Sequence, residues 1–125
     1  MVWRGIHESP GFAVLAEGLQ RHIGQAAAIM RAPFGLSDAD ELGAIVRAAG
    51  FQNVVIHQRS GTVRFPSVER FVLSYVAGSP LAGPVAQAGD AAREALMTDG
   101  RNALVYSPTM LIGFPIAAHL LSAKV

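Results

Sequence analysis

The chain has 125 residues, of which 51% are hydrophobic and only 15% are charged, and its mean hydropathy is +0.35. This length suffices for one hydrophobic core and is too short for two, so we expect a single domain over residues 1–125. Soluble domains carry about 25% charged residues. Apolar surface is therefore left over for an interface, and we expect an oligomer, most simply a homodimer.

Charge and residue usage exclude several classes of partner. Ten basic and nine acidic residues give a formal net charge of +1, and the basic residues are scattered without a cluster that could neutralise phosphates, so nucleic acid is not expected. The absence of Cys removes disulfides, thiolate metal sites and cysteine nucleophiles. Residues 1–5 contain no apolar stretch typical of a secretion signal, so we expect a cytoplasmic protein.

Residues 103–123 carry no charge and are numerous enough to cross a bilayer. Pro108 and Pro115 interrupt this stretch, however, and proline breaks the helix that lipid requires. We therefore expect a buried hairpin and no membrane span.

Four helices are predicted from apolar periodicity and end signals, at about 10–23, 38–49, 67–77 and 84–99. The first has Ser9 as its N-cap. The second is the best defined, because Asp38 and Asp40 lie in its first turn and Gly50-Phe51 is typical of a left-handed helix end. Gly100 leaves the end of the fourth helix open, so residues 100–112 are compatible with helix or strand.

Two to three strands accompany these helices. Residues 54–65 form a predicted strand in which Ser60-Gly61 permits a bulge or turn, and the nearly continuous apolar run at 115–123 is typical of a strand buried on both faces. Residues 1–4 are a strand stub. Residues 25–36 lose helical periodicity and form a predicted connector with one helical turn.

Several stretches resemble one known family, the class I methyltransferases that use S-adenosylmethionine, in particular the ubiquinone and menaquinone biosynthesis (methyltransferase type 11) group. Residues 37–42 (SDADEL) through 49–54 (AGFQNV) resemble the stretch before strand six of that family. The downstream pattern and the exit from strand five have counterparts in RFPS at 64–67, FV at 71–72, GSPL at 78–81, FP at 114–115, AH at 118–119, VWR at 2–4 and ESP at 8–10.

The resemblance covers the whole chain but only the second half of the family's domain. It implies a partial Rossmann-like α/β fold, α+β by content, in which the terminal strand runs antiparallel between strands five and six. The family's cofactor site is a glycine-rich loop after strand one with an acidic residue after strand two. Neither is present, and the glycines at 78–83 lie beside prolines between predicted helices. We expect no S-adenosylmethionine site and no methyl transfer by this chain alone.

The same resemblance implies a truncated methyltransferase-like protein, the acceptor-binding and lid portion, that needs a separate cofactor-binding half. The strand at 116–122 would keep an open apolar edge toward the missing strands. We expect that edge to seal a homodimer or to dock onto the separate half.

Candidate site residues are few. His7 follows the strand stub, where α/β folds place ligands, and is conceivable as a general base, although an ordinary loop histidine is the favoured interpretation. The four histidines have no ligand spacing, so no metal is expected. His119, within the apolar strand, favours a hydrogen-bonded structural role. Five aromatic residues could line the acceptor pocket that the resemblance implies, although core packing is favoured for each; these are Trp3, Phe12, Phe34, Phe71 and Tyr75.

An alternative function belongs to another class. The chain could be a freestanding oligomeric module that binds an apolar small molecule or a protein partner under the third and fourth helices.

Overall fold

The computed structural model describes residues 1–104 and 112–125 and combines helices with an antiparallel sheet, an α+β content. The strands of this part of the chain are β1 (Val2–Trp3), β2 (Gln52–Phe65) and β3 (Ile112–Lys124). Its helices are α1 (Pro10–His22), α2 (Ala26–Arg31), α3 (Ala39–Ala48), α4 (Val68–Ala77), α5 (Ala82–Gln87) and α6 (Asp90–Leu104), with short 3-10 turns η1 (Ile6–Glu8) and η2 (Ala32–Phe34).

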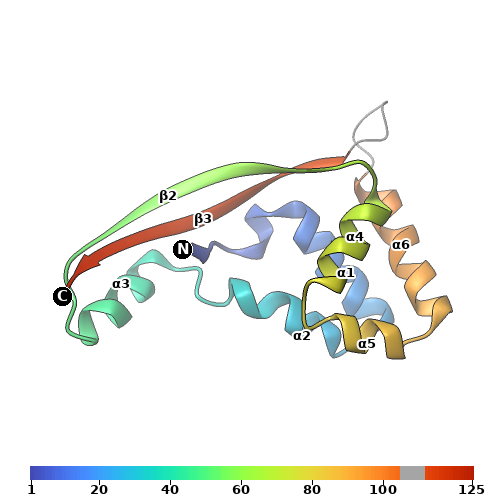
Figure 1. Ribbon diagram of the computed structural model, residues 1–125, viewed down its shortest axis with the longest axis horizontal. Coiled ribbons are helices and arrows are strands. Elements are labelled where there is room, and N and C mark those ends of the chain that lie inside the picture. The colour runs from blue at the N-terminus through green and yellow to red at the C-terminus, as the bar shows by residue number, and fades with distance from the viewer. Residues whose placement is uncertain (105–111) are drawn as a thin grey trace.

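The sheet has the order β1-β3-β2, and β3 is antiparallel to both neighbours. A terminal strand between the amino-terminal stub and the 54–65 strand is the order that the resemblance implies. In Figure 1 the long β2 and β3 strands form a curved ribbon, with α3 beside one end and α4, α5 and α6 near the other. Residues 100–112 were compatible with helix or strand. Of these, residues 100–104 are helical, and residues 105–111 lie outside the described part of the chain.

The irregularity in β2 lies at its start. Asn53 has a positive φ of 50°, a conformation that Asn tolerates better than most residues, and the register shifts between Gln52 and Val55. Ser60 and Gly61 continue the regular pairing with β3, so the bulge or turn predicted there is wrong.

The predicted helices at 10–23, 38–49 and 67–77 correspond to α1, α3 and α4. The end of α3 has the expected left-handed glycine: Gly50 has a φ of 93°, its N–H donates to the Arg47 carbonyl at 2.9 Å, and the Phe51 N–H donates to the Val46 carbonyl at 3.3 Å. The Asp38 carboxylate caps the start of α3 by accepting from the Glu41 N–H at 2.9 Å.

Ser9 is the N-cap residue of α1, as predicted, but its side chain makes no capping hydrogen bond. Ser9 precedes the helix and its carbonyl accepts backbone hydrogen bonds, but its buried hydroxyl has no partner in the part of the chain described.

Two helix predictions are wrong. The single helix at 84–99 is divided into α5 and α6, because Gly89 takes a φ of 87° between them. The connector at 25–36 is instead α2 followed by η2, since Ala26 and Ala27 are buried where α2 packs on α1. Both differences reflect tertiary packing, which overrides weak local propensity.

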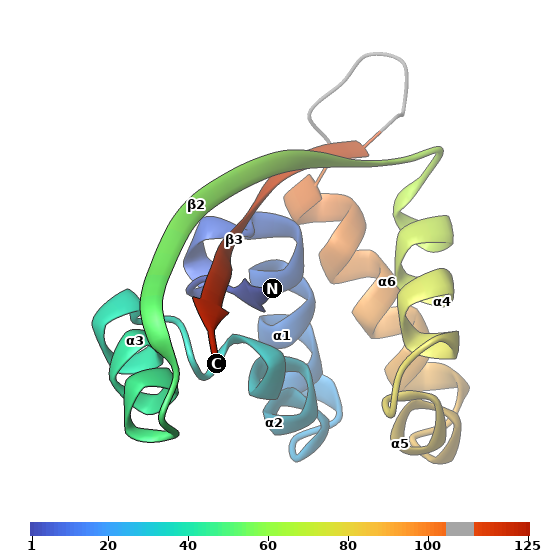
Figure 2. The ribbon, with the colours of Figure 1, turned by 60° about the vertical axis from the view of Figure 1, so that its left-hand side comes forward.

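One aromatic side chain of β3 joins the sheet to the helices. Phe114 is buried, and its ring centroid lies 5.4 Å from that of Phe12 on α1 and 5.1 Å from that of Phe71 on α4. Val63, on β2, pairs with Phe114 across the sheet and packs against the same core. The core therefore lies between the sheet and the helices α1, α4 and α6, which Figure 2 shows grouped together.

The opposite face of the sheet contacts the segment that leads into α3. Successive side chains of a strand point to opposite faces, so His119 lies on the face opposite Phe114. Its side chain is 5% exposed, and its Nε2 donates to the Ser37 carbonyl at 2.8 Å. This contact agrees with the structural role expected for His119 and fixes the start of α3 against β3.

Two glycine substitutions test the packing at Phe114. A Cβ atom at Gly11 would lie 2.2 to 2.4 Å from the buried Phe114 ring, so Gly11→Ala should lower the free energy of unfolding by about 1–3 kcal/mol. Gly43→Ala is the matched control: its Cβ would meet only the flexible Arg47 guanidinium, and the change should stabilise α3 by about 0.5–1 kcal/mol. Denaturant titration measures both, and equal effects of the two changes would contradict this account.

Candidate functional site

The five predicted aromatic residues do come together. The Phe12 ring centroid lies 5.7 Å from that of Phe34, 5.8 Å from that of Phe71 and 5.0 Å from that of Tyr75, and Trp3 stacks on Phe34 at 6.3 Å. Phe12, Phe34 and Phe71 are buried within the core. Core packing, the favoured interpretation, accounts for these three, whereas the half-buried Trp3 and Tyr75 each line a cavity at an end of the cluster.

The Tyr75 cavity has a volume of about 330 Å³. It lies between α2 with η2 on one side and the end of α4 with the following loop on the other, and its wall is mostly apolar. The residues that line it are Ile29, Met30, Ala32, Pro33, Tyr75, Ser79, Pro80 and Leu81. Burial raises the pKa of the Tyr75 hydroxyl, because it disfavours the charged tyrosinate. Tyr75 thus stays neutral near pH 7, and it supplies a hydrogen-bond donor beside an apolar wall.

The Trp3 cavity is smaller, at about 270 Å³, and lies against the sheet. Its lining residues come from β1, β2 and β3 and from the residue before β1; they are Met1, Trp3, Arg59, Ser60, Gly61, Ile116 and Ala118. Arg59 is the charged group of this lining. The two cavities thus differ in chemistry, since the one at Tyr75 has no charged side chain among its lining residues.

His7 lies in η1 directly after β1, as expected, and its side chain is exposed. No hydrogen-bond partner for His7 is found within residues 1–104 and 112–125, and it lines neither the Trp3 cavity nor the Tyr75 cavity. Nearby, the Arg4 Nε donates to the Glu8 carboxylate at 2.8 Å. The surroundings of His7 therefore favour an ordinary loop histidine over a general base.

His22 and Asp99 form a pair that was not predicted from the sequence. Nε2 of His22, in the last turn of α1, lies 2.7 Å from Oδ2 of Asp99 on α6, although 77 positions separate them. Arg21 Nε lies 3.4 Å from the same oxygen. Only the crossing of α1 and α6 brings these residues together, so no local spacing could have found the pair. His22 also lines a third cavity, between the α1–α2 segment and α5.

The described residues contain no group of three or more His, Asp or Glu side chains that could hold a metal ion. None of the helices in residues 1–104 and 112–125 combines the length and the apolar character needed to traverse a bilayer.

The described residues do not fit S-adenosylmethionine either. Gly78 ends α4 and Gly83 lies inside α5, and neither has the positive φ typical of a phosphate-type or cofactor loop. No catalytic step through this cofactor is therefore derived from these residues.

Comparison of the chain with protein-family models, curated proteins and solved structures finds no match. The resemblance to methyltransferases therefore stays a prediction.

The burial of Tyr75 has a consequence at alkaline pH. The unfolded chain releases the tyrosine proton near pH 10.0, whereas the folded chain holds it to a higher pH, so stability should fall as the pH rises between these two values. In a Tyr106→Phe background, tyrosinate absorbance should show Tyr75 titrating above 10.0. Adding Tyr75→Phe should remove this contribution to the pH dependence of denaturant unfolding. A Tyr75 midpoint at the ordinary value would contradict the burial.

Proposed function

We propose that this chain is the acceptor-binding and lid portion of a methyltransferase-like protein whose S-adenosylmethionine-binding half is supplied by residues other than these 125. The observation that supports it most is the sheet: β3, the last strand, lies between β1 and β2 and is antiparallel to both. This is the arrangement that the resemblance leads us to expect for strands five, seven and six. Methyl transfer requires two reactants held in line, so this portion alone would lack the main catalytic contribution.

The acceptor would bind at the Tyr75 cavity. Its wall is apolar, and the Tyr75 hydroxyl and the Ser79 side chain offer polar contacts at its margin. An acceptor with an apolar body and one polar group fits this lining. The residues of α2, η2 and the α4–α5 loop would act as the cover over it, and the aromatic cluster beneath would hold them in place.

The cofactor-binding half would dock at the β1 side of the sheet. β1 is only two residues long and pairs with His119 and Ala118, so most of that edge of β3 has no strand beside it within the described residues. Farther along the sheet face, Val55 and Leu120 are 44% and 39% exposed. Unpaired strand edges and exposed apolar side chains favour association. In the absence of the other half, we expect two copies of the chain to pair through this surface.

Light scattering with a calorimetric titration of S-adenosylmethionine tests the proposal. The purified chain should have the mass of a dimer and should give no saturable heat with the cofactor. Leu120→Glu should shift the mass toward a monomer, because a carboxylate in an apolar interface is costly to bury. Leu73→Glu, at an exposed position on α4, is the matched control and should leave the dimer intact. A monomeric unchanged protein, or saturable cofactor binding, would contradict the proposal.

A freestanding binding module is the second candidate, and the Tyr75 cavity favours it because that cavity is complete without any further chain. The two functions differ in what the chain needs. A module would bind an apolar molecule at this cavity as a stable assembly of identical chains, whereas the acceptor-binding portion would gain methyl transfer when a cofactor-binding half is added.

A further inference from the structure

A cavity of about 650 Å³ lies between the α1–α2 segment and α5. Five of its lining residues are apolar: Ile23, Ala26, Ile29, Pro84 and Ala88. The other three are His22, Gln25 and Gln87, which are polar but carry no fixed charge. None of the residues that line it is Asp, Glu, Lys or Arg. Such a lining favours an uncharged ligand with an apolar body and a few hydrogen-bonding groups.

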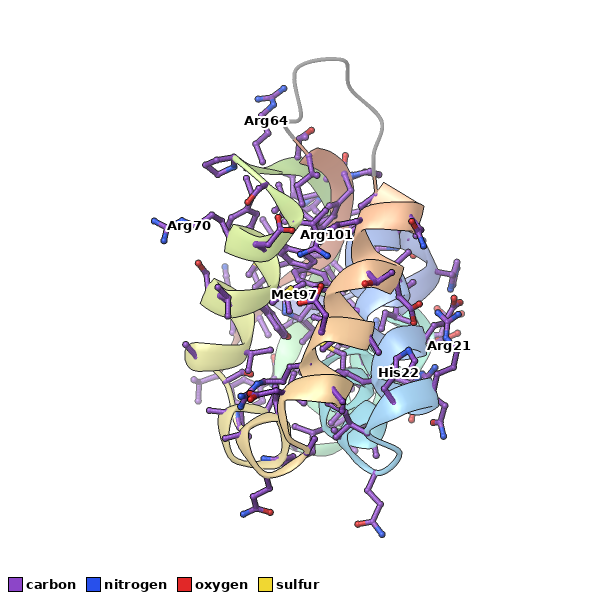
Figure 3. All side chains as sticks on the ribbon, turned by 90° about the vertical axis from the view of Figure 1, so that its right-hand side faces the viewer. Arg21, His22, Arg64, Arg70, Met97 and Arg101 are labelled. Atoms are coloured by element: carbon purple, nitrogen blue, oxygen red, sulfur yellow. The ribbon has the colours of Figure 1, made fainter. Side chains whose placement is uncertain are left out.

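His22 is held in a defined orientation at this cavity. Figure 3 shows its side chain extending from α1 toward α6, where Oδ2 of Asp99 lies 2.7 Å from Nε2. The two helices approach closely at Gly18, where a Cβ atom would lie 2.8 Å from the Leu96 side chain. With side chains 28% and 23% exposed, the pair is partly shielded from water.

The carboxylate of Asp99 determines which ring nitrogen carries a hydrogen. An ionised carboxylate only accepts hydrogen bonds, so Nε2 of His22 must be the donor. In the neutral imidazole the other nitrogen, Nδ1, then bears a lone pair and can only accept. Arg21 Nε, 3.4 Å from the same Asp99 oxygen, helps to hold the carboxylate in place. In its neutral form, His22 therefore carries a defined acceptor atom on a residue that lines the cavity.

We propose that this cavity binds a neutral, planar heterocycle with a lactam edge, that is, an N–H donor next to a C=O acceptor. Nδ1 of His22 accepts the N–H, and a side-chain amide of Gln25 or Gln87 donates to the C=O. The apolar side chains pack against the ring faces. Asp99 disfavours an anion beside His22, and the lining offers no carboxylate to a cation.

The site does not depend on the proposed methyltransferase role. The two proposed sites share only Ile29 among their lining residues, and His22 does not line the Tyr75 cavity. The proposed ligand also differs from an apolar acceptor at Tyr75, because it needs a donor and an acceptor on one edge. The light-scattering and cofactor experiment can therefore contradict the methyltransferase proposal without affecting this one. Likewise, absence of ligand binding at this cavity would not contradict the methyltransferase proposal.

Two probes that differ by one hydrogen-bond donor test the proposal. 2-Quinolone has a lactam N–H, and 1-methyl-2-quinolone has the same ring and carbonyl with the N–H replaced by N–CH₃. In an amide NMR titration of the full chain at pH 8, where an ordinary imidazole is neutral, 2-quinolone should shift residues 22–29 and 84–88 saturably. The methylated probe should bind about tenfold more weakly, since it cannot donate to Nδ1.

Variants identify the acceptor. His22→Phe should remove the preference between the two probes, whereas His57→Phe, at an exposed position of β2, should keep it. If His22→Phe does not fold, Ala88→Trp serves instead: Ala88 is exposed at the end of α5, and the indole should fill the cavity and abolish binding of both probes.

Four outcomes would overturn the proposal. They are equal affinity of the unchanged protein for both probes, a preference that survives His22→Phe, binding that survives Ala88→Trp, and absence of saturable shifts in residues 22–29 and 84–88 up to the solubility of 2-quinolone.

Discussion

The arrangement of the molecule depends on the contacts of Phe114 with Phe12 and Phe71, which attach the helices to the sheet. β3 is the central strand, so a side chain fixed on it also fixes the position of β2 and β1. Gly11 makes the contact possible because any larger residue there would occupy the space of the Phe114 ring. Leu120, farther along the same face of β3, is exposed, so the helices of the described chain cover only part of this sheet face.

The helix and strand pattern could be predicted where local chemistry decides it. The Asp38 cap and the Gly50 end of α3 each form hydrogen bonds to backbone groups only a few positions away. Both can therefore be predicted from the local sequence. The β-branched run Val54-Val55-Ile56 in β2 and the prolines that flank α4 are of the same kind. Such features require no knowledge of what lies across the fold.

Other features depend on packing between distant residues, and these could not be predicted. The division of the 84–99 segment at Gly89 and the formation of α2 follow from how these short helices pack against α1 and α4. A six-residue helix has no stability of its own. The pair of His22 and Asp99 is the clearest case, because it joins two helices whose own sequences contain no motif. The sequence also predicted that the five aromatic residues belong together. Which of them lie in the core and which line a cavity could not be predicted, because that depends on packing between distant residues.

Small side chains create the cavities on both sides of α2. Ala26 and Ala27 are buried and allow α2 to lie close to α1, while Met30 reaches into the core. Ile29 is left between the Tyr75 cavity and the His22 cavity and lines both. Opposite it, Pro80, Pro84 and Ala88 present short or rigid side chains that cannot close the space. A larger residue on either wall would occupy part of the space, so both proposed binding sites depend on these small side chains.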